Sequence, residues 1–101
     1  EVALDGADAV MALRVQSENH GRGGITNIRE YIRLYQLDAR RIQIAKPDAI
    51  IMHPGPVQEG IEVTSAVARG SQSVISEQVT NGVAVRMALL YLAIVRNEAT
   101  Q

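Results

Sequence analysis

Residues 45–56 read Ala-Lys-Pro-Asp-Ala-Ile-Ile-Met-His-Pro-Gly-Pro, and this stretch decides the fold. Its apolar run Ala49–Met52 lies between two proline-containing segments, which is typical of a strand buried on both faces of a parallel sheet. The run Asp8–Val15 has the same character. Because helical patterns separate the two runs, we expect a right-handed βαβ crossover with parallel strands. The sequence therefore predicts an α/β fold, a fragment of a parallel-sheet, three-layer, Rossmann-like architecture.

Apolar residues at helical spacing predict the crossover helices. The first covers Ile28–Tyr35, after a cap at Thr26 or Asn27. The second begins at Asp38 and ends before Pro47, because the residue that precedes a proline disfavours helical geometry.

A long C-terminal helix, Ser76–Arg96, follows a short helix capped by Thr64 or Ser65. The apolar residues of the long helix form two stripes, so we expect it to be sandwiched between two neighbours. Arg86 interrupts its apolar stretch and is either an ion-pair partner of another helix or a functional group. The uninterrupted part is shorter than the ~20 residues that cross a bilayer, so no transmembrane span is expected.

Composition narrows the classes of function. The chain has 101 residues, 47% of them hydrophobic and 21% charged, which fits at most one globular domain. Ten basic against eleven acidic residues leave no basic surplus for nucleic acid or a membrane surface. The absence of cysteine excludes disulfides, thiol nucleophiles and thiolate zinc sites. The N-terminal residues Glu1–Asp5 have no signal-peptide pattern, so we expect a mature or excised piece of a cytoplasmic protein.

Polar side chains follow the first strand. Arg14 and Gln16 point to the same side, since side chains alternate along an extended chain. A guanidinium beside an amide suits a dicarboxylate, and ligands of open α/β sheets bind outside the carboxyl ends of the strands. The alternative is an Arg14 that merely pairs with a local acid such as Glu18.

The second strand ends at the same edge of the sheet. Pro54 and Pro56 have no N–H donors, and Gly55 lets the backbone approach a ligand, so this loop offers carbonyls to an amine or amide. A simple tight turn is the alternative. We expect His53 to be a hydrogen-bonded structural residue rather than a general base. The glycine-rich segment Ser17–Gly24 is either a mobile surface loop or a lid that closes on a ligand.

Three ordered motifs carry a resemblance to a known family. They are Leu13–Gln16 (Leu-Arg-Val-Gln), residues 45–56, and Glu77–Ala88 (Glu-Gln-Val-Thr-Asn-Gly-Val-Ala-Val-Arg-Met-Ala). Together they resemble the C-terminal part of the aspartate-binding domain in the catalytic chain of aspartate carbamoyltransferases. Ornithine carbamoyltransferases look similar in fold but carry a Cys in the corresponding His motif, and this chain has none.

The resemblance implies a reaction. The carbamoyl group passes from carbamoyl phosphate to the amine of L-aspartate, giving N-carbamoyl-L-aspartate and phosphate in pyrimidine biosynthesis, with no metal or organic cofactor. It implies these site residues: Arg14 and Gln16 for aspartate, Glu18 and His53 in support, and the carbonyls of Pro54, Gly55 and Pro56 for the carbamoyl group and the incoming amine. Residues 17–26 would correspond to the loop that closes over aspartate.

The resemblance also implies partners. The carbamoyl-phosphate domain, with its Ser-Thr-Arg-Thr loop, is absent from residues 1–101, so this chain is expected to be a partial domain that is inactive alone. A homotrimer of catalytic chains is expected, with regulatory or dihydroorotase subunits as further partners that the family allows. Two other functions stay open: a non-enzymatic assembly module that uses the long helix, and a carbamoyltransferase for another amino acid.

Overall fold

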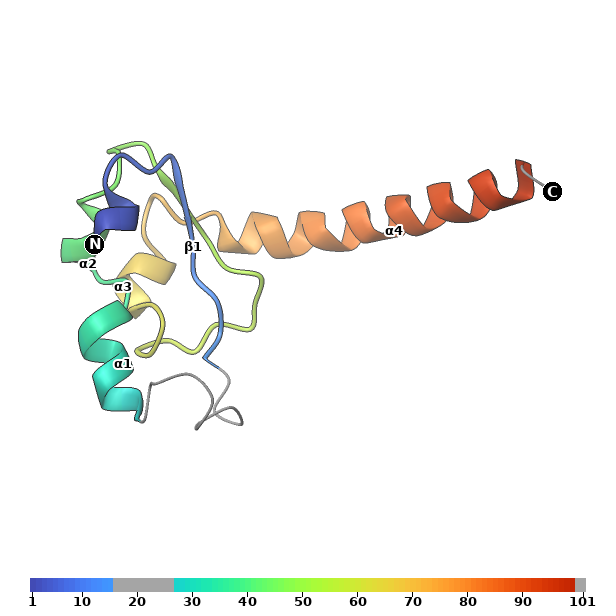
Figure 1. The fold of residues 1–101 in the computed structure, drawn as a ribbon. Coiled ribbons are helices and arrows are strands. Elements are labelled where there is room, and N and C mark those ends of the chain that lie inside the picture. The colour runs from blue at the N-terminus through green and yellow to red at the C-terminus, as the bar shows by residue number, and fades with distance from the viewer. Residues whose placement is uncertain (16–26, 100–101) are drawn as a thin grey trace.

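The computed structural model describes residues 1–15 and 27–99. A small body holds most of the elements, and the last helix projects from it (Figure 1). In chain order the elements are the 3-10 helix η1 (Val2–Leu4), β1 (Ala9–Met11), α1 (Ile28–Tyr35), α2 (Ala39–Ile42), β2 (Ile50–Met52), α3 (Ser65–Ala68) and α4 (Ile75–Ala99). The predicted loop Ser17–Gly24 lies outside the described residues.

The two predicted strands form the predicted parallel pair. Val10 lies opposite Ile51, and the Ala12 N–H donates to the Met52 carbonyl at 3.0 Å just beyond the strands. On its other side, the Ile51 N–H donates to the Gln72 carbonyl at 2.9 Å. The sequence did not indicate this further extended segment, and it places β2 between two parallel neighbours.

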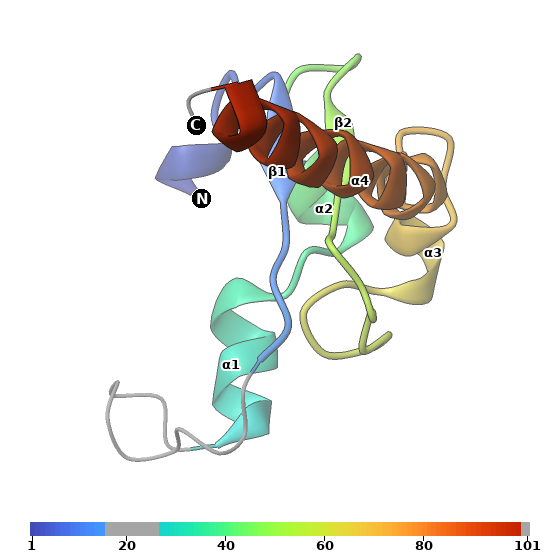
Figure 2. The ribbon, with the colours of Figure 1, turned by 90° about the vertical axis from the view of Figure 1, so that its right-hand side faces the viewer.

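Only one face of each strand is buried. Val10 and Ile51 point into the core, whereas Met11 and Ile50 are 51% and 39% exposed. The expectation of burial on both faces is therefore wrong for the described residues, and the first strand is shorter than the predicted Asp8–Val15. The reason is that α1, α2 and α3 all lie on one side of the sheet (Figures 1 and 2). On the other side α4 projects away from the body, so it does not cover Met11 and Ile50.

The core lies on the helix-covered face of the sheet. It consists of Val10, Ala12, Leu37, Ile42, Ala45, Ala49, Ile51, Val63 and Val67. Three helices of the body start at side-chain caps: oxygens of Asn27, Asp38 and Thr64 accept from the N–H three residues further on, at 2.7, 2.8 and 3.3 Å. Each was predicted as a capping candidate, and each supplies a bond that the first turn of a helix otherwise lacks.

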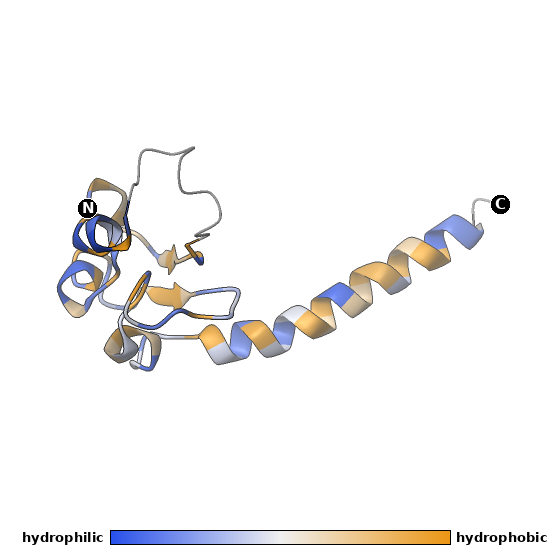
Figure 3. Cartoon of the chain, turned by 90° about the horizontal axis from the view of Figure 1, so that it is seen from below, coloured by the Kyte–Doolittle hydropathy of each residue, from blue (hydrophilic) through white to orange (hydrophobic). Residues whose placement is uncertain are grey.

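The long helix α4 forms as predicted, but among the described residues it has no neighbouring element along most of its length. It covers Ile75–Ala99 rather than Ser76–Arg96. The large apolar side chains from Val79 to Val95 are 41–66% exposed, and apolar residues occur along the whole helix (Figure 3). The predicted sandwich is wrong for the described chain, because α4 extends beyond the small sheet and only its first turns reach β2.

By length and composition alone, the segment Ile75–Glu98 would suffice to cross a membrane. The interruption at Arg86 therefore does not make the apolar segment too short, since a single arginine leaves the surrounding window apolar, and the expectation that no span is present stays a prediction. The Arg86 guanidinium folds back over Gly82, where an added Cβ would lie 3.4 Å from Nη2. Within residues 1–15 and 27–99 Arg86 has no ion-pair partner, so the predicted interhelix pair is not observed there.

Candidate functional site

Arg14 and the loop after β2 meet at the carboxyl edge of the sheet. The Arg14 Nε and Nη2 atoms both lie 3.2 Å from one side-chain amide atom of Gln58. A guanidinium only donates hydrogen bonds, so the amide is oriented with its oxygen toward Arg14 and accepts both bonds. Gln58 follows Pro56 by two residues, so the end of the first strand contacts the segment that follows the second.

His53 is completely buried at the start of that loop and makes three hydrogen bonds. Its backbone N–H donates to Gln78 Oε1 at 2.8 Å, which ties the loop to α4. The Gly55 N–H donates to His53 Nδ1 at 2.8 Å, so Nδ1 is an acceptor and the ring proton is assigned to Nε2. Nε2 in turn donates to Glu62 Oε1 at 2.9 Å. Both ring nitrogens are therefore engaged, and His53 holds the loop in place.

Glu62 is the second member of this buried pair, and the side chains of both residues are 0% exposed. Its Oε1 atom also accepts from the Gln58 N–H at 2.8 Å. Among the described residues, Oε2 has no hydrogen-bond partner. Sequence analysis singled out neither Glu62 nor Gln58. The one available signal was an acidic residue placed between Ile61 and Val63 in an apolar context.

A cavity of about 280 Å³ lies beside this pair, with Tyr31, Tyr35, Leu37 and Glu62 among its lining residues. Burial is the main cause that raises the pKa of Tyr31 above its ordinary value, and the charge of Glu62 adds to the shift. The ring centroids of the two tyrosines are 5.7 Å apart. Tyr31 and Tyr35 of α1 therefore line the same cavity as the carboxylate.

The loop itself presents acceptors and no free donors. Pro54 and Pro56 are exposed and have no N–H, and the Gly55 N–H is already bonded to His53. Gly55 adopts φ +77°, and an added Cβ would lie 3.4 Å from Val79 Cγ2, so the loop packs closely on the start of α4. These three residues can thus bind a ligand through the backbone only by their carbonyl oxygens.

Two predicted partners of Arg14 cannot be placed. Gln16 and Glu18 lie outside the described residues, and their roles stay predictions. Among the described residues, the side chain that contacts the Arg14 guanidinium is Gln58. Among residues 1–15 and 27–99, no group of three His, Cys, Asp or Glu side chains could hold a metal ion.

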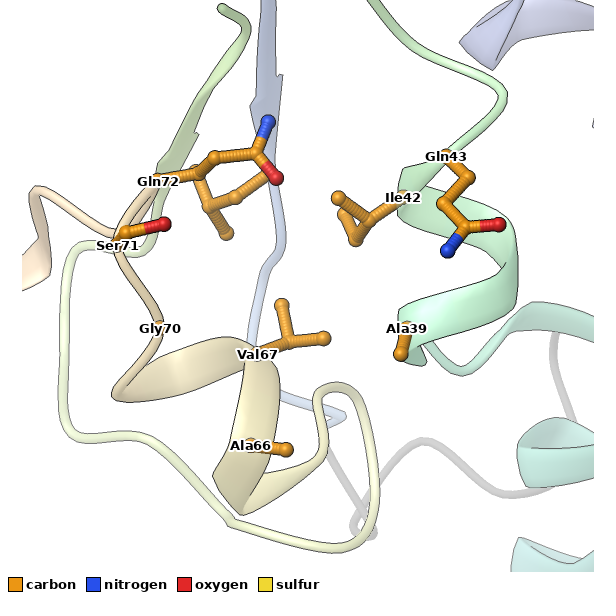
Figure 4. A pocket seen from close by; sticks show the side chains of 9 residues that line it. Ala39, Ile42, Gln43, Ala66, Val67, Gly70, Ser71 and Gln72 are labelled. Carbon is orange, nitrogen blue, oxygen red and sulfur yellow. The ribbon is translucent and has the colours of Figure 1, made fainter. Parts of the chain in front are cut away.

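A second cavity, of about 230 Å³, lies between α2 and α3 (Figure 4). Ile42 and Val67 point into it from the two helices, and Gln43 and Gln72 are on its rim (Figure 4). None of the predicted site residues lines this cavity. The chemistry suggested by the sequence is therefore located at the sheet edge, away from this cavity.

An arginine and a row of backbone carbonyls at the carboxyl edge of a parallel sheet are the kind of arrangement with which α/β proteins bind small polar ligands. The sequence pattern of a known family, described as "Aspartate/ornithine carbamoyltransferase, Asp/Orn binding domain", matches residues 1–93. The chain belongs to this family, which confirms the resemblance drawn from the three motifs. The matched region includes most of α4.

Individual curated relatives have names that agree with this family assignment. The chain is 58% identical over 90 residues to the "Aspartate carbamoyltransferase catalytic subunit" of Syntrophotalea carbinolica, covering 89% of this chain and 29% of the relative. It is 54% identical over 94 residues to the protein of the same name from Moorella thermoacetica, covering 93% and 31%. The chain thus spans about 30% of the length of these curated relatives.

Solved structures share the fold. The anabolic ornithine carbamoyltransferase of Campylobacter jejuni superimposes with a TM-score of 0.77 at 26% identity, covering 94% of this chain and 31% of that one. The aspartate transcarbamoylase of Trypanosoma cruzi, solved with carbamoyl aspartate and phosphate, gives 0.66 at 26% identity, covering 89% and 27%. The predicted Rossmann-like α/β class is therefore confirmed.

Proposed function

We propose that residues 1–101 supply the aspartate-binding part of an aspartate carbamoyltransferase. The observation that carries the proposal is the meeting of Arg14 with the acceptor-only loop Pro54–Pro56 at the sheet edge. The names of the relatives that are 54–58% identical support the same activity. The reaction is transfer of the carbamoyl group of carbamoyl phosphate to L-aspartate, a step of pyrimidine biosynthesis.

The proposed chemistry follows from the groups at the edge. The Arg14 guanidinium binds a carboxylate of aspartate by two parallel hydrogen bonds, with help from Gln16, and Glu18 supports Arg14. The carbonyls of Pro54–Pro56 accept hydrogen bonds from the N–H groups of the amine and of the carbamoyl amide. The amine nitrogen attacks the carbamoyl carbon and a C–N bond forms. The C–O bond to phosphate then breaks, and the departing phosphate, which keeps that electron pair, takes the proton that the amine loses.

Catalysis of this kind depends on positioning and on charge. Carbonyl acceptors aimed at the attacking amine favour its approach, because amine N–H bonds gain positive charge as the new bond forms. His53 takes no proton in this scheme, since both of its ring nitrogens are engaged in the buried network. It supports the site by fixing the loop.

The proposal also specifies aspartate as the amino-acid substrate. Aspartate carries a second carboxylate, and the charge of Arg14 matches it. Ornithine carries a cation in its side chain and would need an acid at the site instead. The open alternative, a carbamoyltransferase for another amino acid, predicts turnover with ornithine or a related amine in place of aspartate.

The rest of the site is proposed to come from outside residues 1–101. The carbamoyl-phosphate domain supplies the phosphate contacts, and the exposed apolar stripes of α4 pack on it. A cytoplasmic homotrimer completes the site with residues of an adjacent subunit. No part of this assembly needs a bound metal or an organic cofactor.

A second candidate function rests on the exposure of α4. A helix whose large apolar side chains are 41–66% exposed from Val79 to Val95 needs a covering surface, which is also what a non-enzymatic assembly module would offer. Such a module would use α4 for assembly, and Arg14 would have no role in its function. The two functions therefore differ in what happens when Arg14 is removed.

The test uses a chimaera of the Syntrophotalea carbinolica relative. The 90 residues of this chain that match that relative replace the corresponding residues of the relative. We expect it to form carbamoyl aspartate, and we expect Arg14→Ala to raise the KM for aspartate at least tenfold without changing the KM for carbamoyl phosphate. Gln43→Ala, in the cavity between α2 and α3, is the matched control. A folded chimaera that binds carbamoyl phosphate but forms no product would contradict the proposal.

A further inference from the structure

We infer that Gln58 is a positioning residue that holds the Arg14 guanidinium in the orientation needed to bind the carboxylate of the amino-acid substrate. This inference deepens the proposed function and rests on it. The observation behind it is the pair of 3.2 Å contacts from Arg14 Nε and Nη2 to the side-chain oxygen of Gln58.

Arg14 needs a partner of this kind. It is an exposed side chain on an extended segment beyond β1, and its four flexible bonds leave it many orientations in solution. Two hydrogen bonds to one acceptor fix the plane of the guanidinium. They use Nε and one side of Nη2, so the other edge of the guanidinium, including Nη1, stays available for a carboxylate.

An amide suits this role better than a carboxylate does. Since the carboxylate of Glu18 is already proposed to support Arg14, a second carboxylate at position 58 would further offset the positive charge that attracts the substrate. The neutral amide orients the guanidinium and leaves its charge intact. It also has lower affinity for Arg14 than a carboxylate has, so it does not compete strongly with the substrate.

Gln58 is itself held by the buried network. Its backbone N–H donates to Glu62 Oε1 at 2.8 Å, and the same oxygen accepts from His53 Nε2 at 2.9 Å. Because both side chains of that pair are 0% exposed, the backbone of Gln58 is anchored to the interior. The network joins the loop that offers carbonyls to the residue that orients Arg14, so the two halves of the site keep a fixed separation.

The experiment compares Gln58→Met with Gln58→Asn and with Gln43→Met in the chimaera. Met keeps the length of the side chain and removes the acceptor. Hydrogen bonds to a charged group contribute enough that we expect the KM for aspartate to rise about tenfold in Gln58→Met. The kcat and the KM for carbamoyl phosphate should change less than about twofold, and Gln58→Asn should recover part of the loss.

A purely structural Gln58 would instead lower kcat and raise both KM values together, or would leave all three unchanged. Either result with folded protein overturns the inference. An NMR measurement of the Arg14 Nε–H group provides a readout that does not depend on activity. The signal, assigned by its loss in Arg14→Lys, should shift and exchange faster with water in Gln58→Met, and an unchanged signal overturns the inference.

The two proposals fail in different ways. If aspartate carbamoyltransferase activity is absent from the unmodified chimaera, the proposed function fails, and the NMR signal still reports whether Gln58 holds Arg14. If the chimaera is active and the Gln58 variants match it, only the inference about Gln58 fails.

Discussion

Replacing the buried carboxylate of Glu62 should destabilise the folded chain strongly. Its Oε1 atom accepts from His53 Nε2 at 2.9 Å and from the Gln58 N–H at 2.8 Å, and no solvent reaches the side chain. Glu62→Leu leaves both donors buried and unpaired. A buried donor left without its acceptor costs about 1–3 kcal/mol, so the two donors together should cost about 2–6 kcal/mol, a large share of the stability of a domain this size.

Glu62→Gln gives a graded comparison. The amide keeps an acceptor at the Oε1 position but loses the charge that strengthens both bonds, which costs roughly 1 kcal/mol for each bond and about 2 kcal/mol in all. Urea unfolding followed by far-UV circular dichroism measures the change. With a slope of about 1.5 kcal/mol per molar urea, the midpoint should fall by roughly 1.3 M.

Asp48→Asn is the matched control, since Asp48 is exposed and should shift the free energy of unfolding by less than about 0.5 kcal/mol. The reasoning is refuted if Glu62→Leu costs less than about 1 kcal/mol. That outcome would mean that the two donors find other acceptors or water. If Glu62→Leu does not fold, the loss in the free energy of unfolding of Glu62→Gln, expected to be about 2 kcal/mol, tests the reasoning by itself.

Three further predictions concern the body of the chain and α4. Absorbance at 295 nm should show that Tyr31 ionises above the usual tyrosine pKa of about 10, so the free energy of unfolding should fall as the pH rises past 10. Glu62→Gln should lower the pKa of Tyr31, because it removes a nearby negative charge. A Tyr31 that ionises at the usual pKa would contradict the burial argument. Ile51→Ala should lower the free energy of unfolding, measured with urea, by about 2–5 kcal/mol, and Ile50→Ala by under about 1 kcal/mol, because only Ile51 is buried. Equal losses would contradict the burial of only one face of the sheet. In residues 1–101 alone, Leu90→Glu, at a position that is 66% exposed, should change the free energy of unfolding by less than about 0.5 kcal/mol. A larger loss would mean that α4 packs on the body of this chain.

Local signals in the sequence predicted the elements well. Asn27, Asp38 and Thr64 were recognised as caps because their side chains satisfy N–H groups within three residues, which is a purely local requirement. The parallel direction of the two strands followed from the order of the elements and the handedness of crossovers, whereas the register that places Val10 opposite Ile51 was not predicted.

Features that depend on distant contacts were not predicted. The segment around Gln72 pairs with Ile51 although nothing in its composition favours a strand, because the pairing is imposed by the tertiary fold. The two stripes of α4 predicted a helix sandwiched between two neighbours, which the described residues do not show, because a pattern on one helix does not say which part of a protein packs against it.

The candidate site was predicted in outline. Arg14 and the His53–Pro56 loop were placed at one sheet edge from topology alone. Gln58 and Glu62 were missed, because a polar residue in a loop shows no period and its partners are set by three-dimensional packing. Buried polar pairs of this kind are found by asking where each donor of a loop finds its acceptor.

The parallel pairing has a consequence for how fast the chain folds. Val10 and Ile51 are 41 positions apart (51 − 10), so the sheet forms only after a long loop has closed, at an entropic cost of roughly 3 kcal/mol. The helices between them need only local contacts and form earlier on such a route. Arg14 therefore reaches Gln58 only late in folding, and their contact would serve as a kinetic marker for completion of the native topology.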